Sequence, residues 1–168
     1  IGGVAGDRVS MLVVPILASF GFTVPKTATR AISSASGTAD AMECLARVDL
    51  TRVEVEKVVK SVGGCIVWGG GVNMAVADDK LIKVRNPLRL DPHGLLLASI
   101  LAKKKAEGAS YVLLDIPYGR GAKIEVLEDA RQLAKEFKEL GAKMGLNIIA
   151  IITDGSEPMT SQMGPALE

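Results

Sequence analysis

A strand–helix–strand pattern toward the end of the chain restricts the fold more than any other feature. Residues 111–116 and 146–152 form apolar runs of strand length, and residues 125–140 between them have the apolar spacing of an amphipathic helix. Two strands joined in this way are parallel, with a right-handed crossover. The pattern predicts an α/β domain, and we expect a three-layer α/β/α arrangement around a mixed, largely parallel sheet.

Further elements are predicted from apolar spacing, capping residues and glycines, and Thr51 with Glu54 is predicted to form a capping box. The predicted helices cover residues 9–20, 39–46, 51–62 and 91–107, and the predicted strands cover residues 65–68 and 81–84. Residues 69–71 and 119–121 are predicted to be loops. Asp91 is expected to cap its helix with Pro92 at the first helical position, and Gly141 is expected to end the long amphipathic helix.

Composition and charge exclude several classes of function. Aromatic residues make up 4% of the chain and the net charge is +1, which argues against binding to nucleic acid or to a membrane surface. No apolar run reaches the roughly 18 residues of a membrane span. The single histidine, His93, cannot by itself form a metal site or a Ser-His-Asp triad, and we expect neither a metal nor another cofactor. Cys44 and Cys65 lie in apolar stretches and are expected to be buried free thiols of a reducing compartment, which indicates a cytoplasmic protein.

The length and the ends of the chain bear on its domain organisation. With 168 residues, it is long enough for one domain with its own core. It begins at Ile1 without a methionine, and residues 164–168 have the pattern of a helix that is just beginning. We expect residues 1–168 to be the central α/β domain of a larger enzyme, although a processed or trimmed chain would have the same ends.

The first candidate site is the glycine-rich segment at residues 1–6, which leads into a helix. Backbone N–H groups around Gly3 can face an anion, and the helix N-terminus favours negative charge. Ser10 adds a hydroxyl donor. A glycine-rich turn without a ligand explains the same residues.

The second candidate site is the segment at residues 29–40, which precedes another helix. Arg30 supplies a guanidinium beside a group of hydroxyl side chains, which suits a phosphate or a sugar phosphate. The hydroxyl residues are Thr29, Ser33, Ser34, Ser36 and Thr38. A capped surface loop is the alternative interpretation.

Charged side chains mark two more candidate sites. Asp91, Ser99 and Lys103 are separated by multiples of four residues, so they share one face of a predicted helix. A lysine on an otherwise apolar helix needs a reason, either a ligand or an extension of the side chain into water. Asp91 is otherwise a helix cap. Lys123 follows a predicted buried strand, at the edge where α/β sheets bind ligands, or it is a solvated turn residue.

These segments, in this order, resemble the thymidine phosphorylase family of pyrimidine and nucleotide phosphorylases over essentially the full chain. Residues 1–7 are similar to the glycine-rich phosphate signature of the family, and Arg30 followed by residues 37–40 is similar to its second motif. The base-recognition pattern of the family is matched by Arg85, Ser99 and Lys103.

Within this family the chain is similar to the archaeal AMP phosphorylase branch. The similarity lies in residues 30–38, 68–70, 91–92 and 119–123. It implies that Asp91 is the proton donor and that a larger group of residues contacts the nucleotide. The implied contacts are Gly3, Thr29, Arg30, Ala31, Ile32, Ser33, Ser34, Thr38, Ser99 and Lys123.

The reaction that the resemblance implies is a pentosyl transfer. AMP or another nucleoside 5′-monophosphate reacts with inorganic phosphate, a co-substrate, to give the free base and ribose 1,5-bisphosphate. The parent enzyme is expected to be a homo-oligomer. Family members also have an all-α lobe and further C-terminal structure, so we expect this chain alone to have little or no turnover.

Three alternatives stay open. A pyrimidine nucleoside (thymidine) phosphorylase would act on a substrate without a 5′-phosphate. A non-catalytic nucleotide- or phosphate-binding module would hold the ligand without turnover. A phosphoribosyltransferase would need a metal-bound pyrophosphate, and the adjacent acidic pair Asp78–Asp79 is better explained as a solvated turn.

Overall fold

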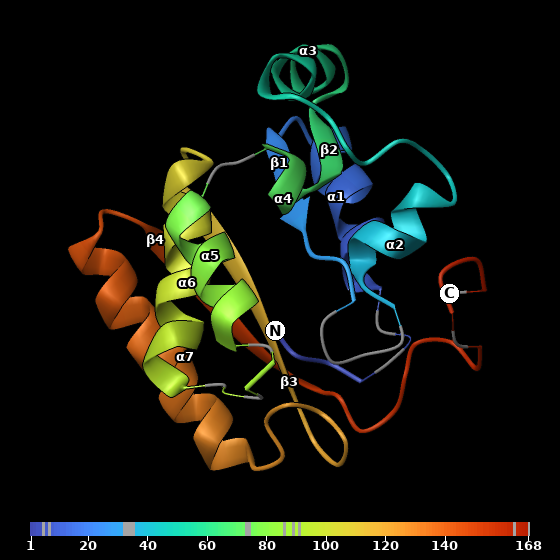
Figure 1. Ribbon diagram of the computed structural model, residues 1–168. Coiled ribbons are helices and arrows are strands. Elements are labelled where there is room, and N and C mark those ends of the chain that lie inside the picture. The colour runs from blue at the N-terminus through green and yellow to red at the C-terminus, as the bar shows by residue number, and fades with distance from the viewer. Residues whose placement is uncertain are drawn as a thin grey trace. The chain divides into compact units, whose positions relative to one another are not determined.

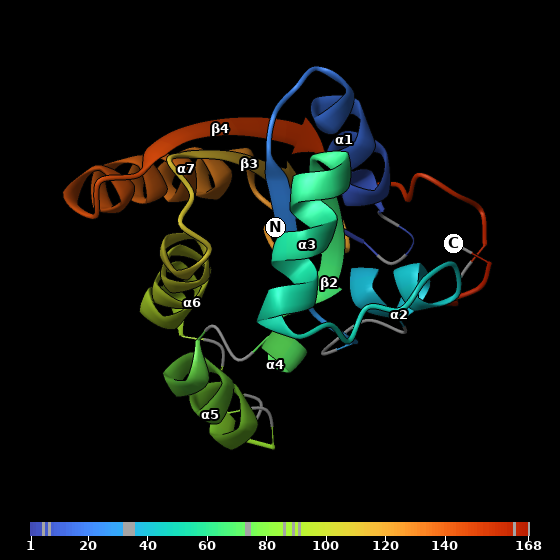
Figure 2. The ribbon, with the colours of Figure 1, turned by 90° about the horizontal axis from the view of Figure 1, so that it is seen from above.

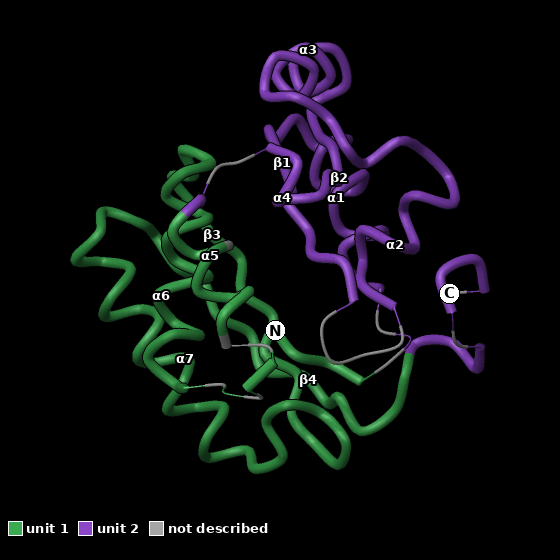
Figure 3. Tube along the Cα trace, viewed as in Figure 1, with its two compact units in different colours: residues 1–4, 77–158 green, residues 5–76, 159–168 purple. Residues whose placement is uncertain are grey.

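The computed structural model of the chain describes residues 1–4, 6, 8–31, 36–72, 75–85, 87–88, 90, 92–162 and 164–167, without the side chains of Asp79 and Arg85. Two compact units make up the chain (Figure 3). Unit 1 contains residues 1–4 and 77–158, and unit 2 contains residues 5–76 and 159–168. Each unit has a pair of parallel strands with helices around it (Figure 1). The predicted α/β class is therefore confirmed, and the three-layer arrangement stays a prediction.

Unit 1 is built around the predicted strand–helix–strand pattern. Its elements are α5 (Val76–Arg85), α6 (His93–Ala106), β3 (Tyr111–Tyr118), α7 (Leu127–Lys143) and β4 (Asn147–Asp154). Only Val76, the first residue of α5, is assigned to unit 2. β3 and β4 are parallel and pair along the full length of both strands. α7 runs along this strand pair (Figure 2). The predicted parallel pairing is confirmed.

The core of unit 1 lies between α7 and one face of β3. Side chains alternate along a strand, so Val112, Leu114 and Ile116 lie on the same face, and all three are buried. Leu133 and Phe137 of α7 belong to the same buried cluster. This packing gives the segments that follow β3 a rigid base.

Unit 2 contains the second parallel pair. Its elements are α1 (Val9–Ser19), β1 (Val24–Ala28), α2 (Thr38–Glu43), α3 (Arg52–Val62), β2 (Gly64–Trp68) and α4 (Gly69–Val72). β1 and β2 are parallel and pair over all 5 residues of each strand. The predicted capping box of α3 is present, because Glu54 N donates to Thr51 Oγ1 and Thr51 N donates to the Glu54 carboxylate.

Helices cover both faces of the strand pair in unit 2. Ile66 and Val67 are neighbours in β2, so their side chains lie on opposite faces. Ile66 packs in a cluster with Val14 of α1, whereas Val67 packs in a cluster with Val55 of α3. The strands are therefore held from both sides, and the segment that begins at Thr29 leaves from the end of β1.

A predicted strand and a predicted loop are both helical. Residues 81–84 lie in α5, and residues 69–71 lie in α4. A short apolar run does not by itself distinguish a strand from a helix, and Leu81 is 49% exposed rather than buried. The glycines of α4 permit close packing, because a Cβ atom at Gly71 would lie 2.1 Å from Asp49 Oδ1.

Two predicted helix boundaries are wrong. α6 begins at His93 with Pro92 at its N-cap position, so Pro92 is not the first helical residue. Asp91, the predicted cap, lies outside the described residues. Gly141 does not end α7 but is buried inside it, and a Cβ atom there would lie 2.3 Å from Ile148 Cδ1. A glycine that looks like a helix end in the sequence is therefore a point of close packing.

The cysteines and the helices bear on the expectations drawn from composition. Cys44 and Cys65 are thiols rather than disulfide partners, as predicted, but Cys44 is exposed, so its predicted burial is wrong. Cys44 directly follows the last residue of α2, where its sulfur donates to the backbone oxygen of Asp40 at 3.6 Å. Among the residues that the structure describes, no helix is long and apolar enough to cross a membrane.

Candidate functional site

In unit 2, the backbone on either side of residues 32–35 comes together at the start of α2. Gly37 is the N-cap residue of α2, and Ala39 N donates to Thr29 O at 3.2 Å. A Cβ atom at Gly37 would lie 2.4 Å from Thr29 O and 2.8 Å from Ala31 N. Only a residue without a side chain leaves room for this contact, so Gly37 permits residues 29–31 to lie against α2.

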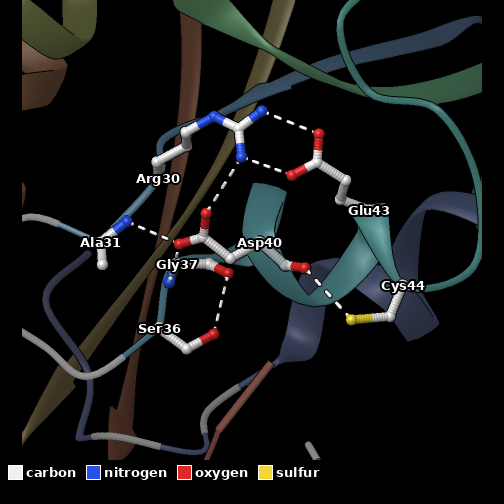
Figure 4. Close-up of polar contacts among 7 residues, drawn as sticks. All are labelled: Arg30, Ala31, Ser36, Gly37, Asp40, Glu43 and Cys44. Atoms are coloured by element: carbon white, nitrogen blue, oxygen red, sulfur yellow. Dashed lines mark hydrogen bonds and ion pairs between the residues drawn. The ribbon is translucent and has the colours of Figure 1, made fainter. Parts of the chain in front are cut away.

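The carboxylate of Asp40 holds these two backbone segments together (Figure 4). Its Oδ2 atom accepts hydrogen bonds from Ala31 N at 2.7 Å and from Gly37 N at 2.8 Å. Asp40 is the third residue of α2, the position from which an acidic side chain reaches back to the helix N-cap. Burial raises the pKa of Asp40. The opposite and larger effect comes from the backbone N–H groups of Gly37 and Ala31 and from the guanidinium of Arg30, so the pKa lies below its usual value.

Arg30, a predicted phosphate ligand, is engaged by two carboxylates of α2 (Figure 4). Its guanidinium donates to both carboxylate oxygens of Glu43, at 2.5 and 2.8 Å, and to Asp40 Oδ1 at 3.3 Å. It also lies over the ring of Trp68, with 4.9 Å between Cζ and the ring centroid. The hydrogen bond with Glu43 raises the pKa of Arg30 and lowers that of Glu43. The predicted contact of Arg30 with phosphate stays a prediction.

A buried arginine supports the same region from the start of α1. Arg8 is the N-cap residue of α1 and is 9% exposed. Its Nη2 atom donates to Ser36 O at 3.0 Å, and Ser36 itself is buried. Ser10, the predicted hydroxyl donor, lies in the first turn of α1 and is half-buried. The start of α1 and the segment before α2 are thus joined within unit 2.

In unit 1, the predicted site residues Ser99 and Lys103 contact the carboxylate of Asp78, which was predicted to lie in a solvated turn. Asp78 of α5 accepts on its Oδ2 atom from Ser99 Oγ at 2.8 Å, and Lys103 Nζ lies 2.8 Å from the same oxygen. Lys103 Nζ also donates to Ser99 Oγ at 3.4 Å. Asp78 is 7% exposed, so its prediction as part of a solvated turn is wrong. The predicted extension of Lys103 into water is replaced by this ion pair.

Also in unit 1, the start of the chain lies beside Lys123. Lys123 N donates to Gly2 O at 2.8 Å. Gly2 has a φ of +66°, and a Cβ atom there would lie 2.4 Å from Lys123 Cβ. Gly3 follows directly, and the Lys123 residue is exposed. The glycine-rich segment and the lysine beyond β3, two separate predictions from the sequence, are therefore neighbours.

Comparison with known proteins adds to this geometry. A family model described as "Glycosyl transferase family, a/b domain" matches residues 1–168. The chain belongs to this glycosyl transferase family. It is 54% identical over all 168 residues to AMP phosphorylase 1 of Archaeoglobus fulgidus, 52% identical to AMP phosphorylase of Pyrococcus furiosus and 51% identical to AMP phosphorylase of Thermofilum pendens. The chain spans about a third of the length of these relatives, namely 33%, 33% and 32%.

In this member of the glycosyl transferase family, the described site residues fall into three groups. The group in unit 2 contains Ser10, Thr29, Arg30, Ala31 and Thr38, and the two groups in unit 1 contain Gly3 with Lys123 and Ser99 with Lys103. The remaining predictions, Ile32, Ser33, Ser34 and Asp91, lie outside the described residues, as does the side chain of Arg85. No group of three or more His, Cys, Asp or Glu that could hold a metal ion occurs in the described part of the chain.

Sequence reasoning missed three residues that organise these groups. Asp40 stood in a quoted motif without a role, although an aspartate three residues after Gly37 is a capping signal. Glu43 carried no signal, because it becomes the partner of Arg30 only through the fold. Asp78 had an indirect signal, since Lys103 on an apolar helix required a partner.

Gly37→Ala is expected to destabilise the protein by roughly 1–3 kcal/mol, the usual cost of forcing an extra atom into a packed region. Gly37 has a φ of −100°, which suits any residue, so the effect would come only from the contact with the backbone of Thr29 and Ala31. The measurement is the free energy of urea unfolding. Gly94→Ala is the matched control, because a Cβ atom at that helical position would meet no described atom within 4 Å beyond its chain neighbours and the backbone of its own helix. Equal stability of both variants would contradict the close contact.

Asp40→Asn is expected to destabilise the protein at neutral pH and to do so less in acid. The pKa of Asp40 is lowered in the folded state, so the unfolded state takes up its proton first as the pH falls below about 4. The stabilisation by the carboxylate is then lost as the pH falls through the folded pKa. The urea midpoints of wild type and variant should therefore lie further apart at neutral pH than at about pH 3. Glu157→Gln, which removes one exposed negative charge, is the control. An equal difference between the two urea midpoints at both pH values would contradict stabilisation by an ionised Asp40 carboxylate.

Proposed function

We propose that this chain is the α/β part of an enzyme that transfers the ribosyl 5-phosphate group of AMP to inorganic phosphate. The products would be adenine and ribose 1,5-bisphosphate. The observation that carries this proposal is the 51–54% identity, over every residue of the chain, to archaeal proteins named AMP phosphorylase. The grouping of predicted ligands within each unit supports it.

The chemistry needs one attack and one proton transfer. Phosphate oxygen attacks C1′ as the bond between C1′ and the base breaks, and positive charge builds on the ribose. The base leaves with the bonding electron pair and takes up a proton. We assign the proton to Asp91, whose acid role requires a pKa raised by burial or by the neighbouring phosphates.

The other residues would bind and orient the two substrates. Gly3, Lys123 and the hydroxyl side chains of residues 29–38 are proposed to contact the phosphate groups, with the backbone held by Asp40. Arg85, Ser99 and Lys103 are proposed to contact the base. The hydrogen bond from Lys123 N to Gly2 O supports the first assignment, because it places the glycine-rich segment beside a lysine.

Several wider properties belong to the same proposal. We infer that residues 1–168 form one domain in which the strands belong to a three-layer α/β/α structure. We further infer a cytoplasmic enzyme that works as a homo-oligomer, uses phosphate as co-substrate without a metal or another cofactor, and binds neither nucleic acid nor membranes. The described helices on both faces of β2 support the layered arrangement.

The direct test uses the complete protein with phosphate and either AMP or thymidine, followed by identification of the released base and sugar phosphate. Adenine with ribose 1,5-bisphosphate is the expected result. Thymine with 2-deoxyribose 1-phosphate would move the protein to the nucleoside phosphorylases and remove the need for 5′-phosphate ligands. Binding without any product would indicate a non-catalytic module.

Asp91→Asn in the complete protein is expected to lower kcat roughly 10²- to 10⁴-fold, the usual contribution of a general acid. Nucleotide affinity should change little, because the amide keeps the size of the side chain and loses only the transferable proton. Single-turnover kinetics would separate the two quantities. His93→Gln is the control, because His93 is an exposed residue two positions away that pairs with Glu136. An unchanged kcat in Asp91→Asn would contradict the acid role.

A further inference from the structure

α5 is attached to the rest of unit 1 through a polar side chain rather than through the hydrophobic core. Asp78 is buried, whereas Val76, Leu81 and Val84 of the same helix are exposed. None of the described α5 side chains belongs to the core cluster of the unit. The position of α5, which ends at Arg85, therefore depends on what Asp78 binds.

The two described partners of Asp78 come from α6. Its Oδ2 atom accepts from Ser99 Oγ at 2.8 Å and forms an ion pair with Lys103 Nζ, also at 2.8 Å. Ser99 is 7% exposed, and the Lys103 side chain is 19% exposed. A buried carboxylate is tolerated only when it is paired and hydrogen-bonded, and these two donors meet that requirement.

This arrangement determines what each partner can offer to a ligand. Because the Ser99 hydroxyl proton points to Asp78, its oxygen acts only as an acceptor toward other groups. One lone pair accepts from Lys103 Nζ, and the second can accept from a ligand. Lys103 uses part of its three N–H donors on Asp78 and Ser99 and retains donor capacity. An acceptor beside a donor matches the edge of adenine, which carries an amino group next to a ring nitrogen acceptor.

We propose that Asp78 is a positioning residue of the nucleotide site, which sets Ser99 as the acceptor and Lys103 as the donor for the base. The inference rests on the proposed function, which assigns those two residues to the base. Asp78 does not itself touch the substrate. It acts through Ser99 and Lys103, and it holds the helix that ends at Arg85.

The first measurement is steady-state kinetics of Asp78→Ala in the complete enzyme. KM for the nucleotide is expected to rise roughly tenfold to a hundredfold, the range for losing a hydrogen bond to a charged group. KM for phosphate should stay near the wild-type value. The nucleotide KM of Asp78→Asn should lie between those of wild type and Asp78→Ala, because the amide oxygen can still accept a hydrogen bond. An equal rise in both KM values would overturn the proposal, because it would indicate a general loss of structure.

A double-mutant cycle separates positioning from stability. In a Lys103→Met background, Asp78→Ala is expected to raise the nucleotide KM much less than in wild type, because the residue through which it acts is already missing. The double variant avoids an unpaired buried charge. Where Asp78→Ala does not fold, Asp78→Asn takes its place in the cycle, because the amide oxygen can still accept from Ser99. Full additivity of the two effects would overturn the proposal.

The matched control is Glu107→Gln. Glu107 is a second buried carboxylate bonded to a lysine of α6, with 2.7 Å between its Oε2 atom and Lys104 Nζ and a side chain that is 4% exposed. Its loss should lower stability and leave the nucleotide KM unchanged. A rise in KM equal to that of Asp78→Ala would overturn the proposal.

The assays use whichever of AMP or thymidine the wild-type enzyme cleaves. Cleavage of thymidine alone would overturn the AMP assignment and leave the test of Asp78 intact, because both substrates present a base. Cleavage of neither would overturn both proposals. Cleavage of AMP with additive effects of Asp78→Ala and Lys103→Met would overturn only the role of Asp78.

Discussion

Burial of apolar helix faces on parallel strand pairs holds each unit together, and the site segments depend on it. A parallel pair requires a crossover connection, and the crossover helix must cover the strands. In unit 1, α7 does so through Phe137, and in unit 2 helices cover both faces of β2. Residues 29–31 leave from the end of β1, and residues 119–123 leave from the end of β3. The polar groups of the site are therefore presented from rigid ends.

Two carboxylates then arrange the polar groups. Asp40 joins backbone on both sides of residues 32–35 and takes part in the ion pairs of Arg30. Asp78 joins α5 to α6 through Ser99 and Lys103. A carboxylate withdrawn from water needs several donors, so each gathers groups that would otherwise move independently. The hydrogen bonds and ion pairs that stabilise these two carboxylates therefore also orient groups that we assign to substrate binding.

Local signals in the sequence were reliable where neighbours in the chain supply the interaction. The capping box of Thr51 and Glu54 and the strand–helix–strand pattern were predicted correctly, because both depend on residues close in sequence or on a regular apolar spacing. Residues 81–84 and Gly141 were misread, because a short apolar run or a single glycine has no meaning without the surface against which it packs. The same limit applies to Asp78, which a purely local reading placed in water.

The sequence by itself determined the α/β class, the parallel pairing of the last two strands, the resemblance to nucleotide phosphorylases and the list of candidate ligands. Only the tertiary structure decided how those ligands are held. It paired Arg30 with Glu43 and Lys103 with Asp78, and it placed Gly2 beside Lys123. The physical reason is that hydrogen bonds and ion pairs act over about 3 Å, so partners far apart in the chain are selected by the packing of helices and strands.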